Sequence, residues 1–206
     1  MTKTSLVVRN VKRDAAVALV TCLLAAPGLA RAGEAVQIED VAFPSALRAG
    51  DADLRLHGGG KLKWLVFDVY VGALYLPDGD AAANALADVP KRLEFHYLVS
   101  IDGEDFGPAG EKILARNVSE EQLASLRDRL DRIRAAYRDV KPGDRYALTY
   151  RPGVGTELTY NGQPLATIEG EDFARAYFSI WLGRKPLDDG FRQSLLRSLP
   201  VAVTQR

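Results

Sequence analysis

The segment LKWLVFDVYVGALYL, residues 62–76, is the most apolar one after residue 32, and it is followed by Pro77. Its many β-branched and aromatic residues, and the proline that stops it, favour one long strand over a helix. Both faces of that strand are mostly apolar, which is typical of a strand covered on two sides. We therefore expect residues 62–76 to form the central strand of a sheet.

The two faces of this expected strand differ, because successive side chains alternate between them. The odd positions from Leu65 to Tyr75 are all apolar, and we expect this face to meet a layer of helices. The even positions are mixed and carry Asp68 and Tyr70 as neighbours, beside Gly72. The alternation therefore places a carboxylate and a phenol on one face, with space next to them.

Asp68 is the unusual residue of the expected strand, because a buried carboxylate is strongly destabilising unless it is paired. One interpretation is an ion pair with Lys61, with Lys63 or with an arginine from a covering helix. The other interpretation places Asp68 with Tyr70 on the wall of a ligand cleft. Tyr70 is itself compatible with a place in the core, provided that its hydroxyl finds a hydrogen-bond partner.

Three consecutive glycines, residues 58–60, precede this strand. Their spacing fits neither a phosphate-binding loop nor a dinucleotide-binding fingerprint, and a strand rather than a helix follows them. They indicate a β-bulge, or a place where a ligand approaches the backbone closely. His96 lies on the more polar face of its expected strand, which favours a surface or capping histidine over a catalytic base.

The other segments supply strands and helices without the alternation of a parallel sheet. We expect strands within 36–43, 54–56 and 92–100 and a meander over 145–168, where Asn161-Gly162 is a strong hairpin signal. We expect helices over 81–89, 105–117, 171–182 and 189–199. A further helix is expected to begin at a capping box formed by Ser119 and Gln122 and to extend to Tyr137. This order predicts an α+β fold in which helices cover one face of a large antiparallel sheet.

The first 32 residues have the pattern of a secretory signal peptide. Arg9, Lys12 and Arg13 precede an uninterrupted apolar run over 15–26, and small residues at 30 and 32 favour cleavage after Ala32. The alternative is a membrane anchor, but a run this short does not span ~30 Å of hydrocarbon. The sequence thus predicts an exported, periplasmic protein whose single domain is residues 33–206, with no membrane span.

Composition excludes several function classes. Lys+Arg and Asp+Glu are both 27, and the basic surplus lies in the first 32 residues, so the expected mature domain is mildly acidic and a poor binder of nucleic acid. The only cysteine lies in the expected signal peptide, and the two histidines, His57 and His96, do not have the spacing of a zinc site. We expect neither a metal nor a cofactor.

Several motifs together resemble the chalcone isomerase-like superfamily. They are LHGGG (56–60), FDVYVGALYLP (67–77), PKRLEF (90–95), EDF (104–106), NG (161–162), DFAR (172–175) and WLG (181–183). The resemblance extends over about residues 36–199, and the chain is most similar to the bacterial exported branch. It implies an open-faced β-sandwich, a large antiparallel sheet covered by helices with a cleft between them. The superfamily includes enzymes that cyclise chalcones, fatty-acid-binding proteins and non-catalytic relatives, so the fold alone does not choose a function.

The resemblance also implies where functional residues would lie. Leu62 takes the place of the enzymes' substrate-binding arginine, Phe106 that of a tyrosine and Ile113 that of an asparagine, and a late threonine or serine falls near Asp188. Tyr70 replaces a threonine of the enzymes but matches a tyrosine with which the fatty-acid-binding relatives hold a carboxylate. Each donor lost from an oxyanion hole can lower the rate ~10²–10³-fold, so the resemblance favours binding over catalysis.

Three functions remain open. The first is a non-catalytic binder of a small hydrophobic or carboxylate ligand, fatty-acid-like or phenolic, in the cleft between sheet and helices. Its candidate ligand-binding residues are Trp64, Val66, Asp68, Tyr70 and Phe106, with Lys61 or Lys63 for an anionic group. The second is an isomerase or intramolecular lyase for a phenolic or unsaturated carbonyl substrate. In it Lys61 or Lys63 would provide electrostatic stabilisation, Tyr70 a hydrogen bond and Asp68 a base of raised pKa. The third is an interaction protein of the cell envelope with a protein partner.

Overall fold

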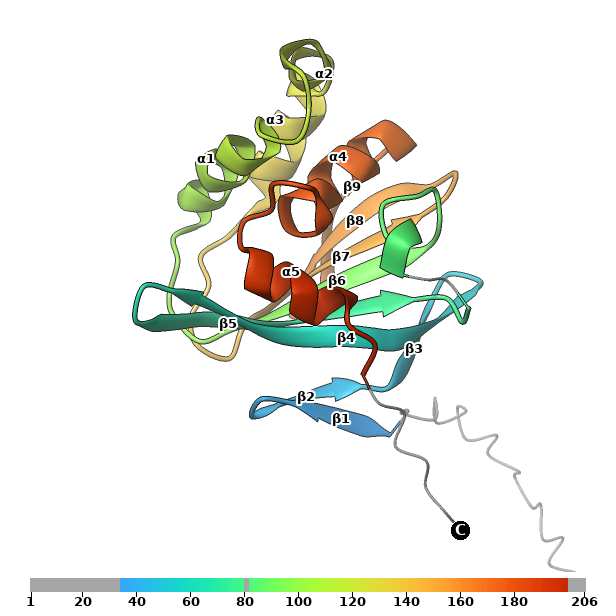
Figure 1. Ribbon diagram of the computed structural model, residues 1–206. Coiled ribbons are helices and arrows are strands. Elements are labelled where there is room, and N and C mark those ends of the chain that lie inside the picture. The colour runs from blue at the N-terminus through green and yellow to red at the C-terminus, as the bar shows by residue number, and fades with distance from the viewer. Residues whose placement is uncertain (1–33, 80–81, 200–206) are drawn as a thin grey trace, which may run out of the picture. The chain divides into compact units, whose positions relative to one another are not determined.

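One antiparallel sheet of seven strands, ordered β3-β4-β5-β6-β7-β8-β9, forms the centre of this computed structural model (Figure 1). The structure describes residues 34–79 and 82–199, so the predicted signal peptide, residues 1–32, lies outside the described residues. The strands of the sheet are β3 Ala46–Ala49, β4 Ala52–Trp64, β5 Phe67–Leu76, β6 Lys91–Tyr97, β7 Arg145–Arg151, β8 Gly155–Tyr160 and β9 Gln163–Ile168. Two further strands, β1 Ala35–Ile38 and β2 Val41–Pro44, form a separate hairpin.

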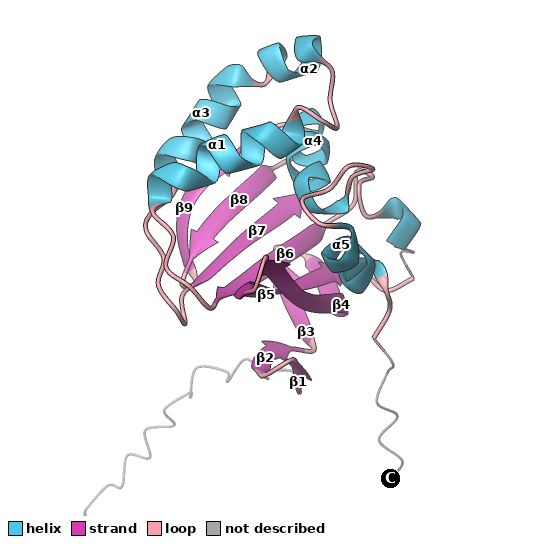
Figure 2. Ribbon diagram, turned by 60° about the vertical axis from the view of Figure 1, so that its left-hand side comes forward, coloured by secondary structure: helices cyan, strands magenta, loops and turns pink. Residues whose placement is uncertain are grey.

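The helices lie on one side of the large sheet and the β1–β2 hairpin on the other (Figure 2). The helices are α1 Gly103–Leu114, α2 Glu120–Ser125, α3 Arg127–Ala136, α4 Glu171–Leu182 and α5 Asp189–Leu196, with a short 3-10 helix at Ala82–Asn84. The predicted capping box is present, because Ser119 and Gln122 exchange both of its hydrogen bonds. The predicted α+β fold, a large antiparallel sheet covered by helices, is confirmed. In the part of the chain described, no helix is both long enough and apolar enough to cross a membrane.

The expected single strand over residues 62–76 is wrong, because the chain reverses at Leu65-Val66. Trp64 at the end of β4 pairs with Phe67 at the start of β5, which leaves a connection of two residues. Leu65 adopts a left-handed backbone conformation with φ of 56°, which bulky side chains rarely adopt. The turn contains none of the glycine, proline or asparagine residues that normally indicate a turn, so the apolar sequence gives no sign of the chain reversal.

A bulge at Val69 separates Asp68 from Tyr70. Tyr70 pairs with Leu62, and Asp68 pairs with Lys63, so no residue of β4 lies opposite Val69. Because Leu62 and Lys63 are consecutive, their side chains, and those of their partners, are on opposite faces. The expectation that Asp68 and Tyr70 share a face is therefore wrong.

From Tyr70 onward, the faces of β5 are also reversed relative to the expectation. Val71, Ala73 and Tyr75, which were expected to meet the helices, pack instead against the β1–β2 hairpin in a small outer core. Tyr70 and Leu74 face the helices in the main core. Both faces of the strand are covered, as predicted, but the layer over Val71, Ala73 and Tyr75 is a hairpin. Apolar side chains alone do not distinguish a covering helix from a covering hairpin.

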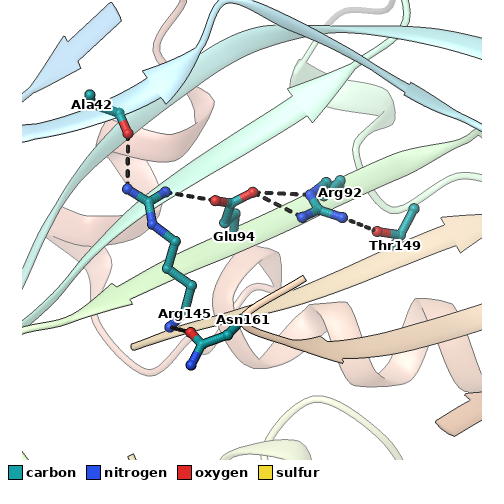
Figure 3. A network of polar contacts seen from close by, with 6 residues as sticks. All are labelled: Ala42, Arg92, Glu94, Arg145, Thr149 and Asn161. Atoms are coloured by element: carbon teal, nitrogen blue, oxygen red, sulfur yellow. Dashed lines mark hydrogen bonds and ion pairs between the residues drawn. The ribbon is translucent and has the colours of Figure 1, made fainter. Parts of the chain in front are cut away.

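An ion-pair network connects the β1–β2 hairpin to the outer face of the sheet (Figure 3). Glu94 lies between two guanidinium groups, with Arg145 at 2.7 Å and Arg92 at 3.0 Å. Arg145 also donates to the carbonyl oxygen of Ala42 in β2, at 2.9 Å, and lies over the ring of Phe43. The largely buried carboxylate of Glu94 thus fixes the side chain of Arg145, and Arg145 in turn contacts β2.

We expect the Glu94→Gln variant to be about 2 kcal/mol less stable than the parent protein, because the amide leaves two guanidinium groups without their anion. The measurement is the free energy of unfolding in urea. Asp53→Asn is the matched control, since Asp53 pairs with Arg48 on the exposed surface and such pairs contribute little. A loss in Glu94→Gln no larger than that in the control would contradict the role of this network.

Gly58 and Gly60 lie under helix α5. A Cβ on Gly58 would lie 2.3 Å from the carbonyl oxygen of Leu195, and one on Gly60 would lie 2.6 Å from the Cβ of Ser194. The bulge predicted here is present, because the β4–β5 register shifts between residues 56 and 58. The close approach that these two glycines allow is that of α5.

Candidate functional site: an apolar cavity with tyrosine hydroxyls

A cavity of about 460 Å³ lies between the helix-facing side of the sheet and helices α1 and α4. Small-molecule sites typically have volumes of ~300–1,000 Å³. The cavity is lined by Leu62, Trp64, Phe67, Val69, Tyr70, Tyr97, Val99, Ile101, Asp105, Phe106, Ala109, Gly110, Ile113, Tyr137, Tyr177, Ile180, Trp181 and Leu187. Asp105 is the only charged residue among them, and it is exposed.

The spacing of side chains on α1 turns one face of that helix toward the cavity. Ala109 and Gly110 follow Phe106 by three and four residues, and Ile113 follows them by four and three, so the four residues lie on the same face. Gly110 has no side chain, and the atom nearest to a Cβ placed there would be Cδ1 of Ile180, at 3.5 Å. The glycine therefore leaves space in the wall between α1 and α4.

Four tyrosines, Tyr70, Tyr97, Tyr137 and Tyr177, are part of the cavity wall. The indole nitrogen of Trp181 donates to the hydroxyl of Tyr70 at 3.1 Å, and the hydroxyls of Tyr137 and Tyr177 are 2.8 Å apart. Tyr97 is 96% buried, and its hydroxyl makes no hydrogen bond to any residue that the structure describes. The protons of Tyr70 and Tyr97, and one from the Tyr137–Tyr177 pair, therefore remain available to a ligand oxygen.

Burial keeps these hydroxyls protonated. It raises the pKa of Tyr70 and of Tyr97 well above the ordinary value, and it raises the pKa of Tyr177 to about 12. Charges are costly in an apolar environment, so the neutral phenol is favoured. The cavity therefore offers neutral hydrogen-bond donors, which suit a carbonyl, hydroxyl or carboxyl oxygen.

We expect the protein to lose stability as the pH rises above about 10, the ordinary tyrosine pKa. Below that pH the folded and unfolded chains are both protonated at these tyrosines, so their contribution is complete. Above it the unfolded chain ionises first, because the pKa values of Tyr70, Tyr97, Tyr137 and Tyr177 are raised by folding. The measurement is tyrosinate absorbance against pH for the folded and the urea-unfolded protein. Coincident titration curves would contradict the burial of these hydroxyls.

Three of the seven predicted ligand-binding residues line the cavity, and four do not. Trp64, Tyr70 and Phe106 are in its wall. Lys61, Lys63 and Asp68 are not part of the lining. Val66, also expected on this wall, projects from the β4–β5 turn and is 87% exposed.

Asp68 forms an ion-pair cluster outside the cavity. Its carboxylate lies 3.0 Å from the ammonium group of Lys61 and 3.7 Å from that of Lys63, and Lys61 also contacts Glu39 at 3.3 Å. The hydrogen bond from Lys61 lowers the pKa of Asp68, so the expectation of a base with a raised pKa is wrong. The paired interpretation of Asp68 is confirmed.

Tyr97, Tyr137, Tyr177 and Trp181 line the cavity and are not among the site residues predicted from the sequence. Tyr97 and Tyr177 lie in the main core, where an apolar pattern alone indicates packing. The available signal was chemical, because buried tyrosine hydroxyls require partners and several of them converging on one core indicate a polar site.

A second hollow, about 440 Å³ in volume, lies between the end of α1, α2 and α4. Exposed cations, among them Arg116, Arg184 and Lys185, lie along it. It is a feature of the outer helix surface and does not reach the sheet. Within 34–79 and 82–199, no cluster of three or more His, Cys, Asp or Glu side chains is arranged to hold a metal ion.

Comparisons with known proteins agree with this architecture. A family model described as chalcone isomerase-like matches residues 35–197. The crystal structure of a fatty-acid binding protein from Arabidopsis thaliana is similar, with a TM-score of 0.60 and 18% sequence identity, over 79% of this chain and 96% of that one. At this identity the likeness shows the fold alone. No curated protein sequence matches the chain. The match over most of its length shows that the chain belongs to the chalcone isomerase-like family.

Proposed function

We propose that this protein binds a small, elongated, apolar ligand in the cavity between the sheet and helices α1 and α4. The observation that carries this proposal is the composition of the wall, in which apolar side chains surround four tyrosine hydroxyls and the only charge is at Asp105. Apolar walls with a few placed polar groups are typical of small-molecule sites. The structurally similar Arabidopsis protein, a fatty-acid binding protein, supports this class of ligand.

The wall favours a ligand with an uncharged oxygen group. No lysine, arginine or histidine lines the cavity among the described residues. Lys61 and Lys63, which were expected to hold an anion, are paired with Asp68 elsewhere. A carboxylate moved from water to this wall would lose hydration without gaining a cation, which is unfavourable. An alcohol, ester, ketone or protonated acid can accept from the tyrosines without that penalty.

Binding fits this wall better than the isomerase alternative does. That alternative assigned the base to Asp68 and electrostatic stabilisation to Lys61 or Lys63, and none of the three lines the cavity. The tyrosine hydroxyls resist ionisation, so they act as donors to a bound oxygen and not as bases. We therefore keep a non-catalytic binder as the proposed function.

We expect 1-hexadecanol to bind more tightly than hexadecanoate at mildly alkaline pH, by about tenfold, because only the carboxylate carries an unpaired charge into the cavity. Displacement of an environment-sensitive apolar dye measures both affinities. Tyr97→Phe should weaken hexadecanol binding about fivefold, the effect of one hydrogen bond. Tyr160→Phe is the matched control, because its hydroxyl bonds Asp144 outside the cavity. Failure of both compounds to displace the dye would overturn the proposal.

Export is a separate part of the proposed function. It rests on the basic, apolar and small-residue pattern of residues 1–32, with cleavage after Ala32 and delivery to the periplasm. A cavity that holds a poorly water-soluble molecule suits a carrier for such ligands in an aqueous compartment.

A further inference from the structure

The β4–β5 turn exposes four consecutive apolar side chains. Trp64 and Phe67 are each 63% exposed, Leu65 is 84% exposed and Val66 is 87% exposed. We call these four residues the apolar tip. Single exposed apolar residues are common on protein surfaces, but a contiguous exposed group indicates an interaction site. Of the five large hydrophobic residues that are exposed in the described part of the chain, four are in this tip.

The apolar tip projects beyond the sheet. Pairing between β5 and β6 starts at Tyr70, and the carbonyl oxygen of Val69 accepts from the backbone of Leu98, just after β6. Only Phe67 and Asp68 pair with β4 alone, as the start of a two-stranded ribbon. Figure 1 shows this hairpin reaching past the ends of the neighbouring strands. The tip is therefore a convex projection, and it can insert into a non-aqueous environment without any movement of the rest of the fold.

The backbone of the tip places Leu65 where small residues are favoured. Its φ of 56° is in the left-handed region, where glycine and asparagine are the usual residues. A leucine there adds exposed apolar surface to a strained turn and gains no packing in return. Folding therefore does not explain the composition of this turn.

The cavity opens beside the apolar tip. Trp64 and Phe67 line the cavity and are also more than half exposed, so the cavity reaches the surface between them and the rest of its wall. Behind the tip lie two cations, Lys61 and Lys63, and two anions, Asp68 and Glu39, joined in ion pairs. This belt has no net charge, and it follows directly after the apolar surface.

We propose that the apolar tip inserts into the interfacial region of a lipid bilayer and brings the mouth of the cavity to the membrane. The four side chains expose about 500 Å², on the basis of ~150–250 Å² for an aromatic side chain. A stable protein interface, with another protein or a second copy of this chain, requires about 800 Å² from each partner. A bilayer requires no complementary surface, and tryptophan is favoured at its interface.

The charge belt suggests which bilayer the tip fits. Because the belt has no net charge, it provides no electrostatic attraction to anionic lipids. We therefore expect the tip to bind a zwitterionic surface. The belt also limits insertion to the tip itself, since the ion pairs remain in water. Exchange of a cavity ligand with the membrane rests on the proposed function, whereas docking of the tip does not.

The test is co-sedimentation of the protein without its predicted signal peptide, residues 33–206, with phosphatidylcholine vesicles at low and high salt. We expect binding that changes little with salt and falls at least about tenfold in the Leu65→Asn, Val66→Ser double variant, which loses about half of the inserted apolar area. The melting temperature of that variant should equal or exceed that of the parent, because asparagine adopts the left-handed conformation readily. Val154→Ser is the matched control, since Val154 is 45% exposed in the β7–β8 turn at the opposite end of the sheet.

The outcomes separate this inference from the proposed function. Binding of hexadecanol in solution should be the same in the parent and the double variant, because Leu65 and Val66 do not line the cavity. A parent protein that binds vesicles but not hexadecanol would support docking and overturn the proposed function. A parent that does not sediment, an unchanged double variant, or self-association through the tip in place of vesicle binding would overturn the docking inference.

Discussion

Gly110→Trp is expected to abolish binding of apolar ligands, with an affinity loss of at least about a hundredfold, because the indole would fill the cavity that the ligand occupies. Gly110 lies on the face of α1 that lines the cavity, and a Cβ there would be in ordinary contact with Ile180. A larger side chain at this position therefore extends into the cavity and not into the backbone of a neighbour.

Gly110→Ala provides the matched control for this experiment. Its methyl group fits without displacement, and alanine in place of glycine stabilises a helix interior by about 0.5–1 kcal/mol. We expect the alanine variant to bind hexadecanol as the parent does and to unfold at a slightly higher urea concentration. Tight binding by a folded Gly110→Trp variant would show that the ligand lies elsewhere.

Gly58→Val is expected to destabilise the fold by about 3 kcal/mol, near the upper end for overpacking, because the clash is with main-chain atoms. A Cβ on Gly58 would lie within 2.7 Å of three carbonyl oxygens at the end of α5, those of Ser194, Leu195 and Arg197. These atoms cannot change rotamer, so α5 must move away from β4. Urea unfolding measures the loss, and faster proteolysis within residues 189–196 would locate it.

Gly110→Ala also serves as the control for this prediction, because it adds a methyl group to a glycine whose surroundings accommodate one. An unfolding free energy for Gly58→Val within about 0.5 kcal/mol of the parent, the usual range of surface substitutions, would mean that α5 is not seated on the glycines as described.

The architecture could be predicted from the sequence because its signals are local. The meander of β7, β8 and β9 follows from alternation and from Asn161, whose φ of 48° suits the Asn-Gly turn. The start of α2 follows from the capping box at Ser119. The β4–β5 turn could not be predicted, because Leu65 and Val66 continue the apolar pattern of the strands on both sides.

The candidate site was predicted only in part. Tyr70, Trp64 and Phe106 were identified and do line the cavity, because they are large residues of the sheet and helix that form its walls. Asp68 was placed beside Tyr70 by strict alternation, which the bulge at Val69 interrupts. A bulge has no reliable residue signature, and a shift of one position moves a side chain to the other face.

Tyr97 illustrates a different limit of sequence patterns. It occupies an apolar position of β6 and lies in the main core. What makes it a candidate ligand donor is a tertiary fact, namely that none of the described residues accepts its hydroxyl proton. Alternation gives the face of a side chain but not the partners that the rest of the fold provides.

Native mass spectrometry would show whether the cavity holds one apolar molecule. The protein would be measured as purified and after incubation with excess 1-hexadecanol, beside a denatured control. We expect a one-to-one complex that is absent after denaturation and absent in Gly110→Trp. A mass that stays that of the protein alone in every sample, or an adduct that persists in Gly110→Trp, would contradict binding in the cavity.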